Sequence, residues 1–188
     1  MKKLIYIFLF LPTFCSSQVL IDSFIYSNWA APIYTGANTA RGQSFICNGT
    51  YTLDSCFFYC DKIGSPTGNV YASLFAHTGT FGTDSKPTGS ALVTSIALPA
   101  SNFTTSASWM KFTFPDNFVM STGYYVLTIS YISGNSSNYI RVYSETTNTT
   151  HAGNRCYYDS SSIWVSASSE TAFYVYGRGQ NIFMGTNF

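Results

Sequence analysis

Short stretches of alternating apolar and polar residues, separated by Gly, Pro and Asn turns, constrain the fold of this chain more than any other feature. The pattern is densest between Thr39 and Ala76. There Cys56, Phe58 and Cys60 would share one face of a strand, because side chains two residues apart point the same way. The turn at Gly64–Gly68 then leads into a second alternating stretch. We therefore expect a half-buried antiparallel hairpin in this part of the chain.

Similar strand and turn patterns continue downstream, and no stretch of ten residues has helical periodicity. Short strands bounded by turn signals at intervals of roughly 8 to 15 residues are typical of all-β sandwiches. The sequence therefore predicts a single antiparallel β-sandwich, jelly-roll-like, that spans residues 18–177. We expect its last strand at Thr171–Tyr176, with Phe173 and Val175 facing inward, and a C-terminal tail over residues 178–188.

Residues 1–17 have the composition of a secretory signal peptide. The basic pair Lys2-Lys3 precedes a mostly apolar run, Leu4–Phe14, which is too short for a membrane-spanning helix of roughly 20 residues. Small residues at Cys15 and Ser17 predict cleavage before Gln18. We expect a secreted protein, extracellular or at the cell surface, that meets a membrane only through this peptide during export.

Two other interpretations of the leader exist. Cys15 could be the anchored residue of a lipoprotein, although the bulky Phe14 stands where a small residue is usual. Alternatively, Leu4–Phe14 could be a buried first strand. Neither alternative changes the prediction for residues 18–177.

Charged residues make up only 9% of the chain, against about 25% in ordinary soluble domains. Loss of the leader would leave seven basic and eight acidic side chains. Without a basic patch to neutralise phosphates, nucleic acid is excluded as an expected ligand. The surface must instead consist largely of Ser, Thr, Asn, Gly and Tyr.

Four cysteines follow the leader: Cys47, Cys56, Cys60 and Cys156. In an exported chain they could form two disulfides. Cys56 and Cys60 on one strand would lie roughly 13 Å apart, too far to pair with each other. The open pairings are therefore Cys47–Cys56 with Cys60–Cys156, or Cys47–Cys60 with Cys56–Cys156. The alternative is that some are buried thiols that pack as small apolar groups.

Four segments carry a resemblance to a known family: Ala40–Phe45, Lys62–Gly68, Lys86–Gly89 and Phe173–Gly177. Together they resemble the "choice-of-anchor R" type of β-sandwich module, which occurs in exported bacterial and phage-derived proteins. The resemblance spans roughly Thr39 to Gly177 and implies a fold rather than an activity, since it brings no catalytic residues. The C-terminal tail lacks the apolar span of an anchor.

No motif predicts catalysis or a metal site. A glycosidase needs two carboxylates across a cleft, but most of the acids here lie at or near turns, where Asp bonds the backbone. Neither His77 nor His151 is accompanied by a Gly-x-Ser-x-Gly motif or by zinc-ligand spacing, and no calcium loop is present. We expect a protein that is not an enzyme and has no cofactor, and we assign no metal-binding residues; the sequence leaves open whether a structural Ca²⁺ is bound.

Aromatic residues make up 18% of the chain, and some lie in its polar regions. Aromatic side chains in loops can stack on sugar rings while neighbouring polar groups reach hydroxyls. The predicted ligand-binding residues are Asn154, Arg155, Tyr157, Tyr158 and Trp164. The competing interpretation is that Tyr157 and Trp164 pack over a sheet.

The predicted function is therefore a secreted, non-catalytic binding or adhesion module whose partner is a glycan or a cell-surface polymer. The alternative is a structural protein of a surface assembly or a phage virion, with no small-molecule ligand. The same neutral surface, rich in Tyr and Thr, would suit contacts between copies. The sequence leaves the oligomeric state open.

Overall fold

A computed structural model describes residues 17–115 and 118–179 of the chain. Their secondary structure is almost entirely β-strand, with one short 3-10 helix, η1 (Ala100–Asn102). In chain order the strands are β1 (Gln18–Phe24), β2 (Trp29–Ile33), β3 (Ala40–Cys47), β4 (Tyr51–Ile63), β5 (Asn69–Thr78), β6 (Lys86–Thr94), β7 (Leu98–Pro99), β8 (Ser108–Thr113), β9 (Val119–Met120), β10 (Gly123–Ser130), β11 (Tyr139–Glu145), β12 (Arg155–Tyr158), β13 (Trp164–Ala167), β14 (Glu170–Thr171) and β15 (Phe173–Gly179).

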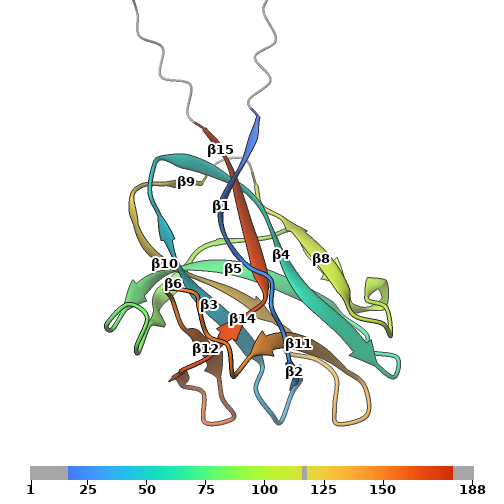
Figure 1. Ribbon diagram of the computed structural model, residues 1–188. Coiled ribbons are helices and arrows are strands. Elements are labelled where there is room, and N and C mark those ends of the chain that lie inside the picture. The colour runs from blue at the N-terminus through green and yellow to red at the C-terminus, as the bar shows by residue number, and fades with distance from the viewer. Residues whose placement is uncertain (1–16, 116–117, 180–188) are drawn as a thin grey trace, which may run out of the picture.

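The strands form two curled sheets that pack face to face (Figure 1). Sheet A has the order β1-β15-β4-β11-β14, with β2 beside β11 and with β8 and β9 beside β4. Sheet B has the order β13-β12-β3-β10-β5-β6, with β7 beside β5. Every strand pair among the described residues is antiparallel. The predicted all-β sandwich is confirmed.

The chain crosses repeatedly between the sheets, and its first strand pairs with its last, which is jelly-roll-like. This topology corrects one expectation. β4 belongs to sheet A and β5 to sheet B, so the two strands joined at Gly64–Gly68 do not form a hairpin. Positive φ angles at Gly64 and Gly68 (67° and 83°) allow the chain to arch from one sheet to the other. Alternation alone does not distinguish an arch from a hairpin, because both place one face of each strand in the core.

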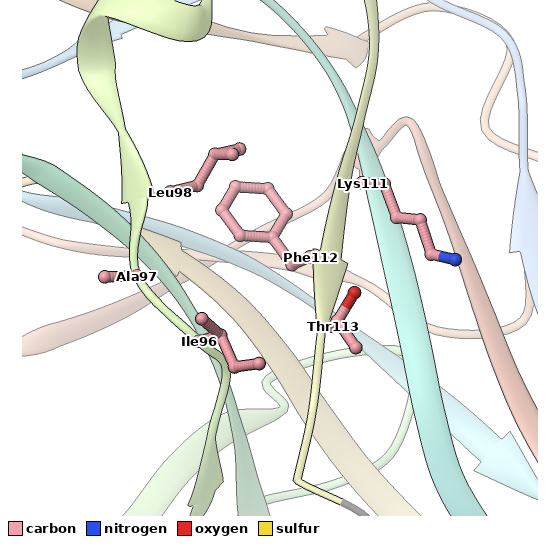
Figure 2. Close-up of a pocket in the computed structure, with 6 residues that line it drawn as sticks. All are labelled: Ile96, Ala97, Leu98, Lys111, Phe112 and Thr113. Atoms are coloured by element: carbon pink, nitrogen blue, oxygen red, sulfur yellow. The ribbon is translucent and has the colours of Figure 1, made fainter.

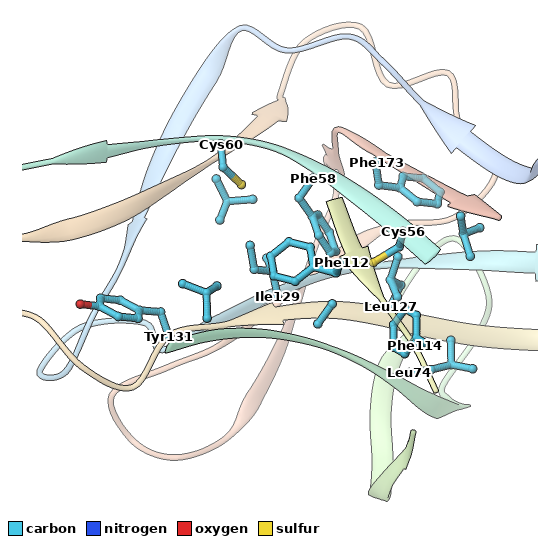
Figure 3. Close-up of a cluster of buried hydrophobic side chains, with 14 of the residues drawn as sticks. Cys56, Phe58, Cys60, Leu74, Phe112, Phe114, Leu127, Ile129, Tyr131 and Phe173 are labelled. Atoms are coloured by element: carbon cyan, nitrogen blue, oxygen red, sulfur yellow. The ribbon is translucent and has the colours of Figure 1, made fainter. Parts of the chain in front are cut away.

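Apolar side chains from the facing surfaces of both sheets fill the space between them (Figure 3). From β4 come Cys56, Phe58 and Cys60, as the alternation predicts, and Leu127 and Ile129 of β10 face them from sheet B. All five are fully buried. Burial of a large apolar side chain contributes about 1.5–3 kcal/mol, so this inner layer is the main source of stability.

The domain boundaries can be compared with the prediction only in part. Residues 1–16 of the expected signal peptide and residues 180–188 of the expected tail lie outside the described residues. The last strand, β15, begins with the buried Phe173 and Val175, as expected. It continues to Gly179, however, because Arg178 still pairs with Gln18 of β1. The sandwich thus extends two residues beyond its predicted end.

The structure does not support the predicted disulfides: Cys47, Cys56, Cys60 and Cys156 are free and buried, as the alternative interpretation expects. Both predicted pairings need a bridge from Cys156 to β4. Cys156 lies opposite Gly42 in sheet B, on the face turned away from the core that holds the other three cysteines. Burial raises the pKa of all four thiols, which suppresses the reactive thiolate. They act as small apolar side chains.

Within the described ranges, the chain forms no helix long and apolar enough to cross a membrane.

Candidate functional site

The five predicted ligand-binding residues belong to one segment of chain, but the structure does not bring them into one surface. β12 and β13 are strands, where the sequence suggested aromatic residues in loops. β12 pairs with β3, so Arg155 and Tyr157 lie on the face that carries the core. Tyr158 and Trp164 lie on the opposite face, with their ring centroids 5.2 Å apart.

Asn154 is committed to backbone hydrogen bonds. Its side chain accepts the Ser85 N–H (3.0 Å) and donates to the Ser85 and Arg155 carbonyls (3.2 and 3.0 Å). Both amide hydrogens are therefore used, and only 2% of the residue is exposed. In this arrangement Asn154 holds two loops together and has no donor left for a ligand.

A larger aromatic surface lies on the outer face of sheet A. Six half-buried rings meet there, and they come from β4, β8, β11 and β15: Phe57, Tyr59, Trp109, Tyr143, Tyr174 and Tyr176. We call this set the aromatic face. Its rings form a continuous series, with centroid distances of 5.1 Å for Tyr143–Tyr59, 5.1 Å for Tyr59–Trp109 and 4.5 Å for Trp109–Tyr174. Phe57 then contacts both Tyr174 and Tyr176, at 6.3 and 5.8 Å.

Strand register explains why these rings meet. Tyr59 pairs with Trp109 on β8, and Phe57 pairs with Tyr174 on β15, so the outward side chains of three neighbouring strands lie side by side. Three adjacent strands span about 10 Å. The rings are tilted against one another, by 47° for Tyr59–Trp109 and 62° for Trp109–Tyr174. The surface is therefore ridged.

The aromatic face was missed from the sequence, although a signal was present. In β4 the positions that alternate with the core residues Phe58 and Cys60 should be polar on a solvated sheet, yet they hold Phe57 and Tyr59. An aromatic outer face on a strand with an apolar inner face is therefore the sequence signal for this surface.

Charged groups border the aromatic face. Asp61, which is 1% exposed, accepts hydrogen bonds from Nε of Arg141 (2.8 Å), from Nη2 of Arg141 and from the Tyr143 hydroxyl (2.9 Å). The hydrogen bonds to Asp61 raise the pKa of Arg141, and burial raises the pKa of Tyr143. At another point Nζ of Lys111 lies 6.0 Å from the Phe57 ring centroid. The surface thus combines apolar rings with fixed donors and acceptors.

A small groove lies between the segment 96–98 and β8 (Figure 2). Its volume is about 130 Å³, and Leu98 and Phe112 point into it while Lys111 points to the other side of β8. Ile96 at its rim is 64% exposed. The groove offers apolar contacts from Ile96, Leu98 and Phe112 but no convergent polar groups.

A more polar pocket of about 190 Å³ is lined by His151, Ser169 and Glu170, among others. Oε1 of Glu170 accepts the His151 N–H, whereas Oε2 of Glu170 and Oγ of Ser169 have no hydrogen-bond partner. Burial raises the pKa of the Glu170 carboxyl. Both ring nitrogens of His151 are engaged, Nε2 with Asp22 (3.2 Å) and Nδ1 with the Gly153 N–H (3.0 Å). No ring nitrogen of His151 is left to act as a general base.

The other histidine is part of a loop network. Nε2 of His77 lies 3.0 Å from Oγ of Ser85, which is fully buried and also interacts with the Thr80 carbonyl (3.4 Å). Burial lowers the pKa of His77. Across residues 17–115 and 118–179, no three His, Cys, Asp or Glu side chains are grouped so that they could hold a metal ion.

No protein-family model matches the chain, and no curated protein matches it in sequence. The resemblance to choice-of-anchor R modules therefore stays a prediction.

Proposed function

We propose that this protein is a secreted, non-catalytic binding module that attaches to a glycan or a cell-surface polymer through the aromatic face of sheet A. The single observation that carries the proposal is the continuous series of six half-buried rings on the outer face of sheet A. The export step rests on the signal-peptide pattern of residues 1–17.

The aromatic face has the chemistry that carbohydrate recognition requires. The C–H faces of a sugar ring are apolar and pack on aromatic rings, while its hydroxyls need donors and acceptors at the edge of the contact. Trp109 and Tyr174, with ring centroids 4.5 Å apart, supply adjacent apolar surfaces. Arg141, whose side chain is 32% exposed and is held by Asp61, supplies N–H donors beside it. Since Tyr and Trp lose little side-chain entropy on binding, such a surface is suited to recognition.

The low charge of the chain supports a neutral partner. Charged residues contribute 9% of the sequence, so long-range electrostatic attraction is weak and contact must come from packing and hydrogen bonds. A polymer that repeats one unit would compensate for weak individual contacts by offering many copies of the same site.

The test is a glycan-array and insoluble-polysaccharide binding screen of the purified protein and of two variants, Trp109→Ala and Trp164→Ala. Trp109 lies on the aromatic face, whereas Trp164 lies on sheet B and serves as the matched control. We expect Trp109→Ala to reduce binding at least tenfold, since aromatic anchors at interfaces are worth about 2 kcal/mol or more. Trp164→Ala should bind like the wild type.

The opposite pattern would refute the assignment of the site. If only Trp164→Ala lost glycan binding, the binding site would lie in the β12–β13 region that was predicted from the sequence. An empty array, combined with concentration-dependent self-association that Trp109→Ala abolishes, would favour the structural alternative, in which copies of the protein bury the aromatic face against each other. Light scattering coupled to size-exclusion chromatography measures that association.

A further inference from the structure

Two arginines are buried side by side between the sheets, at a distance from the aromatic face. Arg41 of β3 and Arg155 of β12 project from the core-bearing face of sheet B and are 3% and 8% exposed. Arginine is almost never buried to this extent unless it is paired with an anion. These two therefore need a partner that explains their position.

Aromatic rings cover the guanidinium faces of both arginines. Cζ of Arg155 lies 4.8 Å from the Trp29 ring centroid, and Cζ of Arg41 lies 5.1 Å from it. The Tyr157 ring lies 5.9 Å from each of them. Cation–π contact stabilises a guanidinium through its face but satisfies none of its N–H donors, which lie in its plane.

Several of those donors have no acceptor. Nε of Arg41 and both Nε and Nη1 of Arg155 are buried without a hydrogen-bond partner. Nη2 of Arg41 makes a long contact, 3.5 Å, with the Pro32 carbonyl oxygen. In the part of the chain that the structure describes, the ion pairs involve other side chains, those of Arg141, His151 and Arg178.

The cluster is consequently a concentrated positive charge. Burial, with the neighbouring Arg155 as the second cause, lowers the pKa of Arg41 to about 9, and burial also lowers the pKa of Arg155. The pKa shift of Arg41 reflects burial and a second cation nearby, whereas the pKa shift of Arg155 reflects burial. An anion between or beside them would relieve the repulsion and accept the free N–H groups.

One member of the cluster, Trp29, reaches the protein surface. Trp29 is the first residue of β2, an edge position of sheet A, and is 41% exposed. The cluster therefore lies just beneath the surface, with the indole as its outer wall. A rotation of that ring would open the guanidinium edges to a small ligand.

We propose that Arg41, Arg155, Trp29 and Tyr157 form a binding site for an oxyanion, a carboxylate or sulfate group of the kind that acidic sugars carry. Arg41 and Arg155 supply the charge and the N–H donors. Trp29 and Tyr157 hold the guanidinium planes in place. The site is separate from the aromatic face, and it can be tested with small anions alone, so its failure would leave the proposed glycan function untouched.

The test measures thermal unfolding of the purified protein at constant ionic strength and pH, with sodium chloride replaced stepwise by sodium glucuronate, acetate, sulfate or phosphate. We expect a saturable rise in Tm in the millimolar range with at least one carboxylate or sulfate. The apparent Kd should weaken at least tenfold in Arg41→Met and in Arg155→Met. Lys86→Met removes one positive charge from β6 and should leave the response unchanged.

The controls separate site binding from general salt effects. Sulfate and phosphate stabilise many proteins by exclusion from their surface, without saturation and without regard to a single arginine. A rise in Tm that does not saturate, or one that persists in both arginine variants, would overturn the proposal. If the saturable rise in Tm is larger with glucuronate and acetate than with sulfate, the ligand group is a carboxylate. A larger rise with sulfate identifies a sulfate ester.

A second measurement covers the case in which the variants do not fold. The chain has four arginines, so the Nε–H resonances of the wild-type protein can be followed individually by NMR during a glucuronate and a sulfate titration. We expect saturable shifts of two of the four resonances. If neither anion shifts any of them, or if both shift all four weakly and in proportion to concentration, the cluster is only a stacked structural core and the proposal is wrong.

Discussion

The carboxylate of Asp61 holds Arg141 and Tyr143 at the border of the aromatic face, and its removal gives a sharp prediction. Asp61→Asn keeps the shape of the side chain but removes its charge. The two N–H groups of Arg141 and the Tyr143 hydroxyl then lose an ionised acceptor. Because only 2% of the Asp61 side chain is exposed, water cannot enter to serve as the acceptor in place of the lost carboxylate.

The expected cost follows from the geometry. A hydrogen bond to a charged group contributes about 1.5–3 kcal/mol, and two connect Arg141 to Asp61. The Arg141 side chain is 32% exposed, so part of its guanidinium regains water in the variant and the loss is reduced. We therefore expect a decrease of about 2–3 kcal/mol in the free energy of unfolding. For a chain of this size that corresponds to a Tm about 4–12 °C lower.

The assay is urea unfolding followed by circular dichroism, for the wild type, Asp61→Asn, Arg141→Met and the double variant. Asp54→Asn is the matched control, because Asp54 pairs with Arg178 at 3.4 Å with 23% of its side chain exposed, and it should cost less than about 1 kcal/mol. In the double variant the losses should be less than additive. A cost below about 0.5 kcal/mol for Asp61→Asn, or strict additivity, would refute the view that this ion pair fixes the edge of the aromatic face.

Two further predictions concern the core. The buried Tyr131 donates a hydrogen bond to the Thr67 carbonyl (2.7 Å), and burial raises the pKa of the Tyr131 hydroxyl. The contribution of this hydroxyl to folding stability is therefore complete below the unfolded pKa of about 10 and is lost as pH rises through the folded pKa. Tyr131→Phe should cost about 1 kcal/mol at pH 8 by chemical denaturation, and that difference should shrink towards pH 11; a constant difference would contradict the assignment. The four cysteines of the sandwich should resist a thiol reagent such as DTNB in the native state and react fully in denaturant without reductant, whereas a loss of free thiols under those conditions would reveal a disulfide.

The sequence by itself determined the class of the fold and the orientation of individual strands. Alternation depends only on local backbone geometry, so the inward positions Cys56, Phe58 and Phe173 could be identified without knowing what they pack against. Turn residues such as Gly64 and Gly68 likewise marked where strands end. These features are local, and the tertiary structure retained them.

Tertiary structure alone decided which strands pair and which distant side chains meet. β4 and β5 follow each other in the chain yet belong to different sheets, because burial of one face is satisfied equally by an arch across the core. Strand pairing likewise decides which residues share the aromatic face. Tyr157 and Tyr158 are neighbours in sequence, but a strand places them on opposite faces of sheet B, whereas Trp109 and Tyr174 meet only because β8 and β15 flank β4. Adjacent side chains on a strand point to opposite faces of the sheet, so a surface of a sandwich is made of residues that strand register brings together from different strands.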